Sequence, residues 1–219
     1  MNVGSYFGNS WIGLFVKTNN SISLVPIDCP EKLCAKIETA LKTTVVRTSV
    51  AETNLVGVYT AMNSNGIIVP NLATENEIIN LRKLGINVYA SKDKHNAIGN
   101  NLAVNDKSGV INEAVSLEEK KNIEDTLGIE LQQQKMGGYT TIGSCCIANN
   151  KGFLLHYKAS EKEIEEVKAV FRIPGNKGTV NMGTGFVSIG LICNDTGYLA
   201  GEATSAHELG RVEEALGFL

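Results

Sequence analysis

The sequence predicts an α/β protein that closes into a ring of five pseudo-symmetric units. Two observations lead to this fold class: a turn asparagine recurs five times, and a helix start follows each turn at a near-constant step. The turn asparagines, spaced by 44, 42, 44 and 45 residues, are Asn19, Asn63, Asn105, Asn149 and Asn194. Because a unit of about 44 residues cannot bury its own apolar face, neighbouring units must cover one another.

Each turn is expected to join the two strands of a β-hairpin. A glycine follows the asparagine in four copies, and Ile22 takes that place in the first copy. The four glycines are Gly66, Gly109, Gly152 and Gly197. Asparagine and glycine tolerate the positive φ that such turns need.

The helix starts read as capping boxes, in which a side chain at the N-cap and a glutamate three residues later satisfy each other's backbone N–H groups. They are Asp28-x-x-Glu31, Thr74-x-x-Glu77, Ser116-x-x-Glu119, Ser160-x-x-Glu163 and Ser205-x-x-Glu208. Five such boxes in phase with five turns indicate an internal repeat.

In chain order, each unit reads as strand, strand, turn, strand and helix. The strand ahead of the turn is expected over residues 11–17, 55–61, 97–104, 141–148 and 186–193. The strand after the turn is expected over 22–26, 67–70, 110–111, 153–155 and 198–200. A further strand opens units two to five at 45–48, 86–90, 129–131 and 179–181. Apolar stripes at helical spacing predict helices over 30–41, 75–84, 117–127, 161–171 and 206–216.

The repeat favours one closed domain. An open array needs polar capping repeats, whereas the first and last units here are close to typical. Closure also removes exposed strand edges. We therefore expect a single domain over 1–219, with strands around the axis and helices outside. Its repeats are approximately 1–42, 43–84, 85–127, 128–171 and 172–219.

Composition excludes several classes of function. The net charge of −3 argues against a general nucleic-acid binder, and no run approaches the ~20 apolar residues of a membrane span. The spacing of the five cysteines matches no zinc pattern, so we expect reduced thiols in a cytosolic protein. No glycine-rich stretch has phosphate-binding form. We expect no cofactor and no metal.

Several motifs, taken in their order, resemble the translation initiation factor 6 family of archaea and eukaryotes. The resemblance covers nearly the whole chain, and the length matches the archaeal members. The motifs are Asn-Gly-Ile-Ile-Val-Pro at 65–70, Ala-Ile-Gly-Asn at 97–100, Gly-Ser-Cys-Cys at 143–146, Gly-Thr-Val-Asn at 178–181 and Thr-Ser-Ala-His-Glu-Leu at 204–209.

The resemblance implies a fold and a function. The family's fold is the pentein ring of five α/β units. Its members bind the large (50S) ribosomal subunit near ribosomal protein L14 and the sarcin–ricin loop, and they block joining of the small (30S) subunit. They act in translation initiation and in large-subunit biogenesis or recycling, and none is an enzyme. We accordingly expect a cytoplasmic monomer that contacts neither membrane nor DNA.

The resemblance also points to candidate ribosome-binding residues. Asn100 matches a family position implicated in subunit binding, and the turn with Asn63 and Asn65 matches another loop. Because equivalent turns must emerge on the same side of a ring, the candidate set is Asn63, Asn65, Asn100, Asn105 and Asn150. Turn chemistry alone also explains the recurring asparagines. Val58, Asn65 and Met182 stand where relatives can carry basic residues, so a less electrostatic contact is expected.

Two other function classes remain open. Guanidine-modifying enzymes such as deiminases and amidinotransferases use the same ring fold, with a cysteine nucleophile and a histidine. In this chain, Cys193 is the candidate nucleophile and His156 or His207 is the candidate base. Cys193 lies in an apolar run, however, and no substrate-binding carboxylate cluster is evident, which favours a packing role. The third class is a ring that binds a small molecule in its axial cavity.

Overall fold

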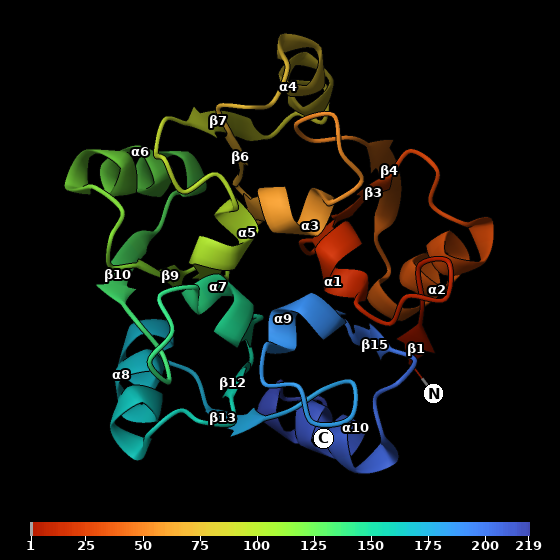
Figure 1. Ribbon diagram of the computed structural model, residues 1–219, viewed down its shortest axis with the longest axis vertical. Coiled ribbons are helices and arrows are strands. Elements are labelled where there is room, and N and C mark those ends of the chain that lie inside the picture. The colour runs from red at the N-terminus through yellow and green to blue at the C-terminus, as the bar shows by residue number, and fades with distance from the viewer. Residues whose placement is uncertain (1) are drawn as a thin grey trace.

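The computed structural model describes residues 2–219 and forms a ring of five three-stranded sheets around a central axis (Figure 1). The predicted fold class is therefore confirmed. The first sheet consists of β2 (Lys17–Thr18), β3 (Ile22–Pro26) and β4 (Thr44–Thr48), and the second of β5 (Ala61–Met62), β6 (Gly66–Pro70) and β7 (Asn87–Ser91). The third sheet consists of β8 (Leu102–Val104), β9 (Ser108–Asn112) and β10 (Glu130–Gln134). The fourth consists of β11 (Cys146–Ala148), β12 (Phe153–His156) and β13 (Gly175–Gly178). The fifth sheet is β14 (Leu191–Cys193), β15 (Tyr198–Gly201) and β1 (Val3–Gly4).

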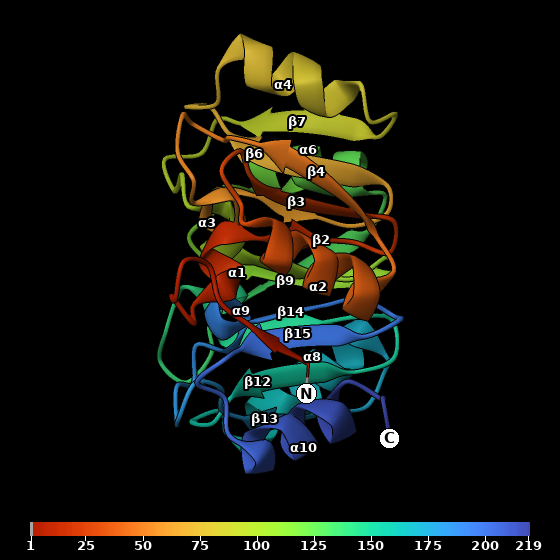
Figure 2. The ribbon, with the colours of Figure 1, turned by 90° about the vertical axis from the view of Figure 1, so that its right-hand side faces the viewer.

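The two ends of the chain meet in the fifth sheet. In the other four sheets, the outer strand pairs parallel with the middle strand and follows it through a helix. Strand β15 is the last strand within residues 2–219, and β1 takes the place of the outer strand and pairs parallel with it (Figure 2). The Lys36 ammonium also donates to the Val3 carbonyl oxygen at 2.7 Å. The N-terminal strand therefore closes the ring.

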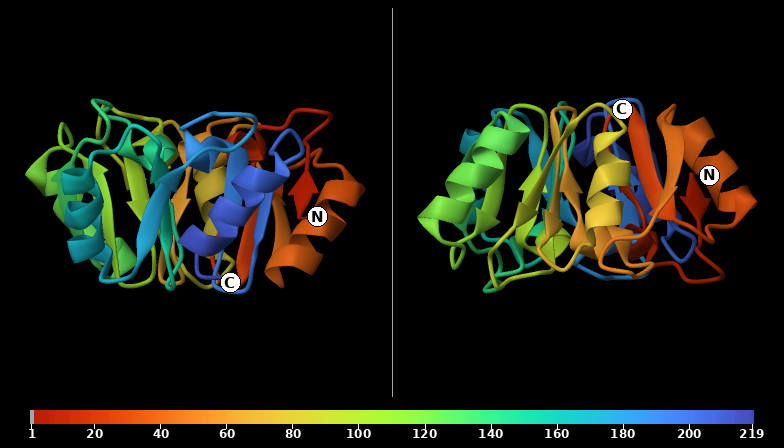
Figure 3. Two further views of the ribbon diagram at one scale, coloured as in Figure 1. Left: turned by 90° about the horizontal axis from the view of Figure 1, so that it is seen from below. Right: turned by 90° about the horizontal axis from the view of Figure 1, so that it is seen from above.

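Five long helices cover the outside of the ring, as predicted (Figures 1 and 3). They are α2 (Glu31–Leu41), α4 (Glu75–Arg82), α6 (Leu117–Leu127), α8 (Glu161–Phe171) and α10 (Ala206–Ala215). Each turns an apolar stripe inward; in α2 the stripe is Leu33, Ile37 and Leu41, all buried. No helix within residues 2–219 combines the length and apolar content needed to cross a bilayer.

The expected capping boxes form in full at Thr74, Ser160 and Ser205. Ser116 accepts from the Glu119 backbone N–H, but the Glu119 carboxylate bonds elsewhere. The first copy was predicted wrongly. Helix α2 starts from Pro30 without a side-chain cap, because the Asp28 carboxylate instead accepts from the Tyr6 hydroxyl at 2.6 Å.

The prediction of a strand ahead of each hairpin turn was also wrong for the first half of each of these segments. Those residues form a single helical turn close to the axis, followed by a strand of two or three residues (Figure 1). The turns are α1 (Ile12–Phe15), α3 (Val56–Tyr59), α5 (Ile98–Asn101), α7 (Ile142–Cys145) and α9 (Val187–Gly190). The axis is thus surrounded by helical turns as well as by strands.

Close backbone packing explains these turns. A Cβ atom built on Gly57 would lie 2.0 Å from the Gly13 carbonyl oxygen, and one on Gly99 would lie 2.0 Å from the Gly57 oxygen. Gly143 approaches Gly99 in the same way, and the fifth turn has Ser188, whose hydroxyl donates to the Gly143 oxygen at 2.5 Å. This tertiary contact overrides the β-propensity of the flanking apolar residues.

The ring has two different faces. One carries the five short helices and the loops that precede them, and we name it the α-turn face (Figures 2 and 3). The inner strands run from this face to the recurring hairpin turns, which form the opposite, asparagine face. Strands β3, β6, β9, β12 and β15 run back, so the long helices begin at the α-turn face.

Candidate functional site

The five turn asparagines form a closed belt of hydrogen bonds around the axis. Each is at least nine-tenths buried, and its Nδ2 donates to the backbone oxygen of the next one along the ring. The pairs are Asn19–Asn63 at 2.9 Å, Asn63–Asn105 at 3.3 Å, Asn105–Asn149 at 3.0 Å, Asn149–Asn194 at 3.1 Å and Asn194–Asn19 at 3.2 Å. Each Oδ1 also accepts from backbone N–H groups of its own turn. The amides of Asn63 and Asn105 are thereby engaged inside the protein.

A second polar layer lies beside this belt. Asn150 Nδ2 donates to Asp106 Oδ2 at 2.8 Å and to Asp195 Oδ2 at 2.6 Å, and Asn20 Nδ2 bonds to the same two oxygens. Burial raises the pKa of Asp106, but the donated hydrogen bonds, led by that of Asn150, outweigh it and leave the pKa lowered. Asn150 is therefore a donor to partly buried carboxylates, whereas Asn65 is exposed and donates to the Leu127 oxygen at 2.9 Å.

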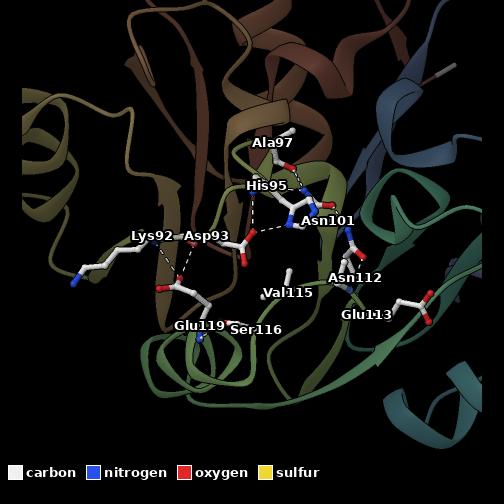
Figure 4. Close-up of polar contacts among 12 residues, drawn as sticks. Lys92, Asp93, His95, Ala97, Asn101, Asn112, Glu113, Val115, Ser116 and Glu119 are labelled. Carbon is white, nitrogen blue, oxygen red and sulfur yellow. Dashed lines mark hydrogen bonds and ion pairs between the residues drawn. The ribbon is translucent and has the colours of Figure 1, made fainter.

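Asn100 lies in α5 on the other face of the ring. Its side chain is partly exposed and forms no hydrogen bond within residues 2–219. The adjacent Asn101 differs: it donates to the Ala97 oxygen at 2.9 Å and accepts from Asn112 at 2.8 Å (Figure 4). The structure therefore separates Asn100 from Asn63, Asn65, Asn105 and Asn150, and it leaves the Asn100 amide free for a partner.

Sequence reasoning missed an apolar feature of the α-turn face. Most of the large exposed hydrophobic side chains lie on this side, in the loops or at the helix starts that follow the strands. They are Phe7 (68% exposed), Ile27 (63%), Leu72 (54%), Leu117 (74%), Tyr157 (47%) and Met182 (81%). Apolar residues among turn formers are the sequence signal that could have found them. They come from all five units of the ring and lie on one of its two faces, so this face offers apolar contacts to a partner.

Buried glutamates hold the loops of this face in place. The Glu208 carboxylate of α10 accepts from the backbone N–H groups of Met182 at 3.2 Å and Gly183 at 2.8 Å. Asn181 and Met182 have positive φ values of 48° and 61°, which this contact stabilises. Glu77 binds the equivalent loop of another unit, through the N–H groups of Ala51 and Glu52. The loops are thus fixed before any partner binds.

These contacts predict a pH dependence. Burial raises the pKa values of Glu77, Glu163 and Glu208, but hydrogen bonds outweigh it and all three are lowered. A lowered folded pKa means that the ionised form stabilises the fold above the unfolded pKa of 4.5, and that this stability is lost as the pH falls through the folded pKa. Urea unfolding between pH 7 and pH 3 should show this loss. Glu208→Gln should flatten the slope; an unchanged slope would contradict the assignment.

The alternative enzyme would need a histidine beside the Cys193 thiol, and the structure places neither candidate there. Cys193 is buried, and burial raises its pKa to about 12, so the group is a thiol. Neither His156 nor His207 lines the axial cavities. His156 packs against Tyr139, and its Nδ1 accepts from the Lys158 N–H at 3.0 Å. Cys193 therefore packs as a small apolar residue.

Comparison with known proteins agrees with these observations. The sequence model of the eIF-6 family matches residues 1–215. The chain is 34% identical over 211 residues to "Translation initiation factor 6" of Pyrobaculum arsenaticum, which covers 96% of each chain. It is 34% identical over 215 residues to the protein of that name from Picrophilus torridus, covering 97% of each. The Staphylothermus marinus protein is 35% identical over 216 residues, covering 97% of this chain and 95% of its own.

The match is continuous over all five units of the ring, and the relatives have nearly the same length. The chain belongs to the eIF-6 family.

Proposed function

We propose that the protein binds the large ribosomal subunit through its α-turn face and prevents the small subunit from joining. The observation that carries the proposal is that six large exposed apolar side chains lie on the face that also bears the free amide of Asn100. The relatives' name supports a role in translation. The action is steric and uses no cofactor.

The character of the face indicates the kind of contact. Aromatic residues and methionine are enriched at protein–protein interfaces, and Phe7, Tyr157 and Met182 supply them here. The net charge of −3 limits the electrostatic attraction to rRNA phosphates. We therefore infer that a ribosomal protein, in the region of L14, makes the main contact, and that the sarcin–ricin loop makes a smaller one. Binding should depend only weakly on salt.

The loops that the glutamates hold support steric blocking. A surface whose loops are already ordered loses little conformational entropy when it binds. A ring with such a face can occupy a broad area of the large subunit without rearranging. Action in the cytoplasm during subunit maturation or recycling, as well as in initiation, follows from the same binding.

Asn100→Ala tests the polar part of this contact. We expect the affinity for purified large subunits to fall by about 1–3 kcal/mol, roughly 5- to 150-fold, because a buried partner loses its hydrogen bond. Stability should change little, since the Asn100 side chain bonds no group in residues 2–219. Co-sedimentation with large subunits measures the affinity, and thermal unfolding measures the stability.

Asn65→Ala is the matched control on the asparagine face, where the side chain is also exposed. Its affinity for large subunits should stay at the wild-type value. If Asn100→Ala binds normally while Asn65→Ala loses binding, the contact lies on the asparagine face, and our assignment of the face is wrong. The earlier prediction for Asn63, Asn65, Asn105 and Asn150 would then be preferred.

A further inference from the structure

A small cavity of about 50 Å³ lies on the axis between the helical turns and the asparagine belt. It is lined mainly by apolar side chains of the inner strands, together with Gly13 and Ser188 of the helical turns. Among the described residues that line it, Lys17 is the one charged group. The equivalent position in the other units is apolar, with Ala61, Ala103, Ile147 and Ile192. The repeat therefore places a single cation in an otherwise neutral cavity.

Lys17 has no counter-charge in the part of the chain that the structure describes. It forms no ion pair and no hydrogen bond with residues 2–219. The carboxylates of Asp106 and Asp195, which line the neighbouring axial pocket, bind the amides of Asn20 and Asn150. Burial lowers the pKa of Lys17 to about 8, so its ammonium form still predominates at neutral pH. Lys17 is partly buried, and an ammonium partly withdrawn from water without a counter-charge is destabilising.

Two thiols line the same cavity. Cys146 and Cys193 are buried in adjacent inner strands, and neither forms a hydrogen bond within the described residues. Burial raises the pKa of both, so each keeps its S–H, which is a weak donor. Lys17, Cys146 and Cys193 thus offer donors toward one space. Protonated thiols beside an ammonium disfavour a metal cation there.

We propose that the axial cavity binds a small monovalent inorganic anion of the size of chloride, with Lys17 as its counter-charge. The volume supports this size, because one water needs about 10–15 Å³ measured in the same way. The small volume favours a small anion over a larger one such as phosphate. The anion would neutralise the partly buried ammonium and so stabilise the ring. This site is independent of the α-turn face.

Bromide is the probe, because its anomalous scattering identifies it in a crystal. We expect an anomalous peak within about 3.5 Å of Lys17 Nζ in crystals of the full chain grown in sodium bromide. Lys17→Met should remove the peak while keeping the fold, since the equivalent positions carry Ala and Ile. Absence of a peak in the wild-type cavity, or a peak that Lys17→Met leaves unchanged, would overturn the proposal.

A solution measurement gives an independent readout. Replacing gluconate, which is too large for the cavity, by bromide at constant ionic strength should raise the melting temperature of the wild type in a saturable manner. Lys17→Met and Lys17→Ile should show no such rise. An equal rise in these variants would contradict the site, because the bromide effect would then not depend on the Lys17 ammonium.

Discussion

Gly57→Ala is expected to destabilise the ring by more than about 3 kcal/mol. The added Cβ would lie 2.0 Å from the Gly13 carbonyl oxygen and 2.8 Å from that of Val16. Both obstacles are backbone atoms, so no side-chain rotation can relieve the clash, and the α1 and α3 turns would have to move apart. Urea unfolding monitored by circular dichroism would measure the loss.

Gly210→Ala is the matched control. Gly210 lies within helix α10, and a Cβ atom built there meets no atom within 4 Å. Alanine has the higher helix propensity, so this substitution should stabilise the protein by up to about 1 kcal/mol. If Gly57→Ala were as stable as the wild type, the close packing of the helical turns would not be a requirement of the fold.

Asn149→Ala should cost about 3–4 kcal/mol, which is the second largest effect that we expect. The buried side chain forms four hydrogen bonds: its Nδ2 donates to the Asn194 and Leu216 oxygens, and its Oδ1 accepts from the Lys151 and Gly152 N–H groups. Each net contribution is about 1 kcal/mol, and the partners left without a bond are buried. Urea unfolding measures this loss as well.

Comparison of Asn149→Ala with Asn105→Ala isolates the contribution of the fourth hydrogen bond, which Asn149 donates to the Leu216 oxygen. Asn105 has the same place in the belt but forms three bonds, to the Asn149 oxygen and to the N–H groups of Lys107 and Ser108. Its loss of stability should therefore be about 1 kcal/mol smaller. Near-neutral values for both variants would show that the belt does not hold the units together, and that these asparagines serve another purpose.

The sequence predicted the repeat and the outer helices because both depend on local signals, and it predicted the closure from the likeness of the first and last units. Turn asparagines, capping residues such as Ser160 and Ser205, and apolar stripes all act within a few residues of one another. The helical turns around the axis were missed for the opposite reason. Gly13 and Gly57 are 44 positions apart, and only their contact across a unit boundary explains why these apolar segments are not strands.

The candidate site was predicted only in part. The turn asparagines were expected together on one face, and the structure places them there. A sequence does not show, however, that the side-chain amides of Asn63 and Asn105 form hydrogen bonds within a buried belt. Nor does it show that Asn100 lies at the other end of the axis. The exposure of the Phe7 and Leu117 side chains depends on the arrangement of the whole ring, because apolar residues like these are buried in the core of many other folds.

Site-specific cross-linking tests the docking of the α-turn face most directly. A photoreactive amino acid at position 182, on the α-turn face, and another at position 219, at the end of the chain, would be irradiated separately with purified large subunits. Both side chains are highly exposed, at 81% and 86%. The account predicts cross-links to a large-subunit protein from position 182 and none from position 219. Cross-links from position 219 alone, with co-sedimentation intact, would contradict it.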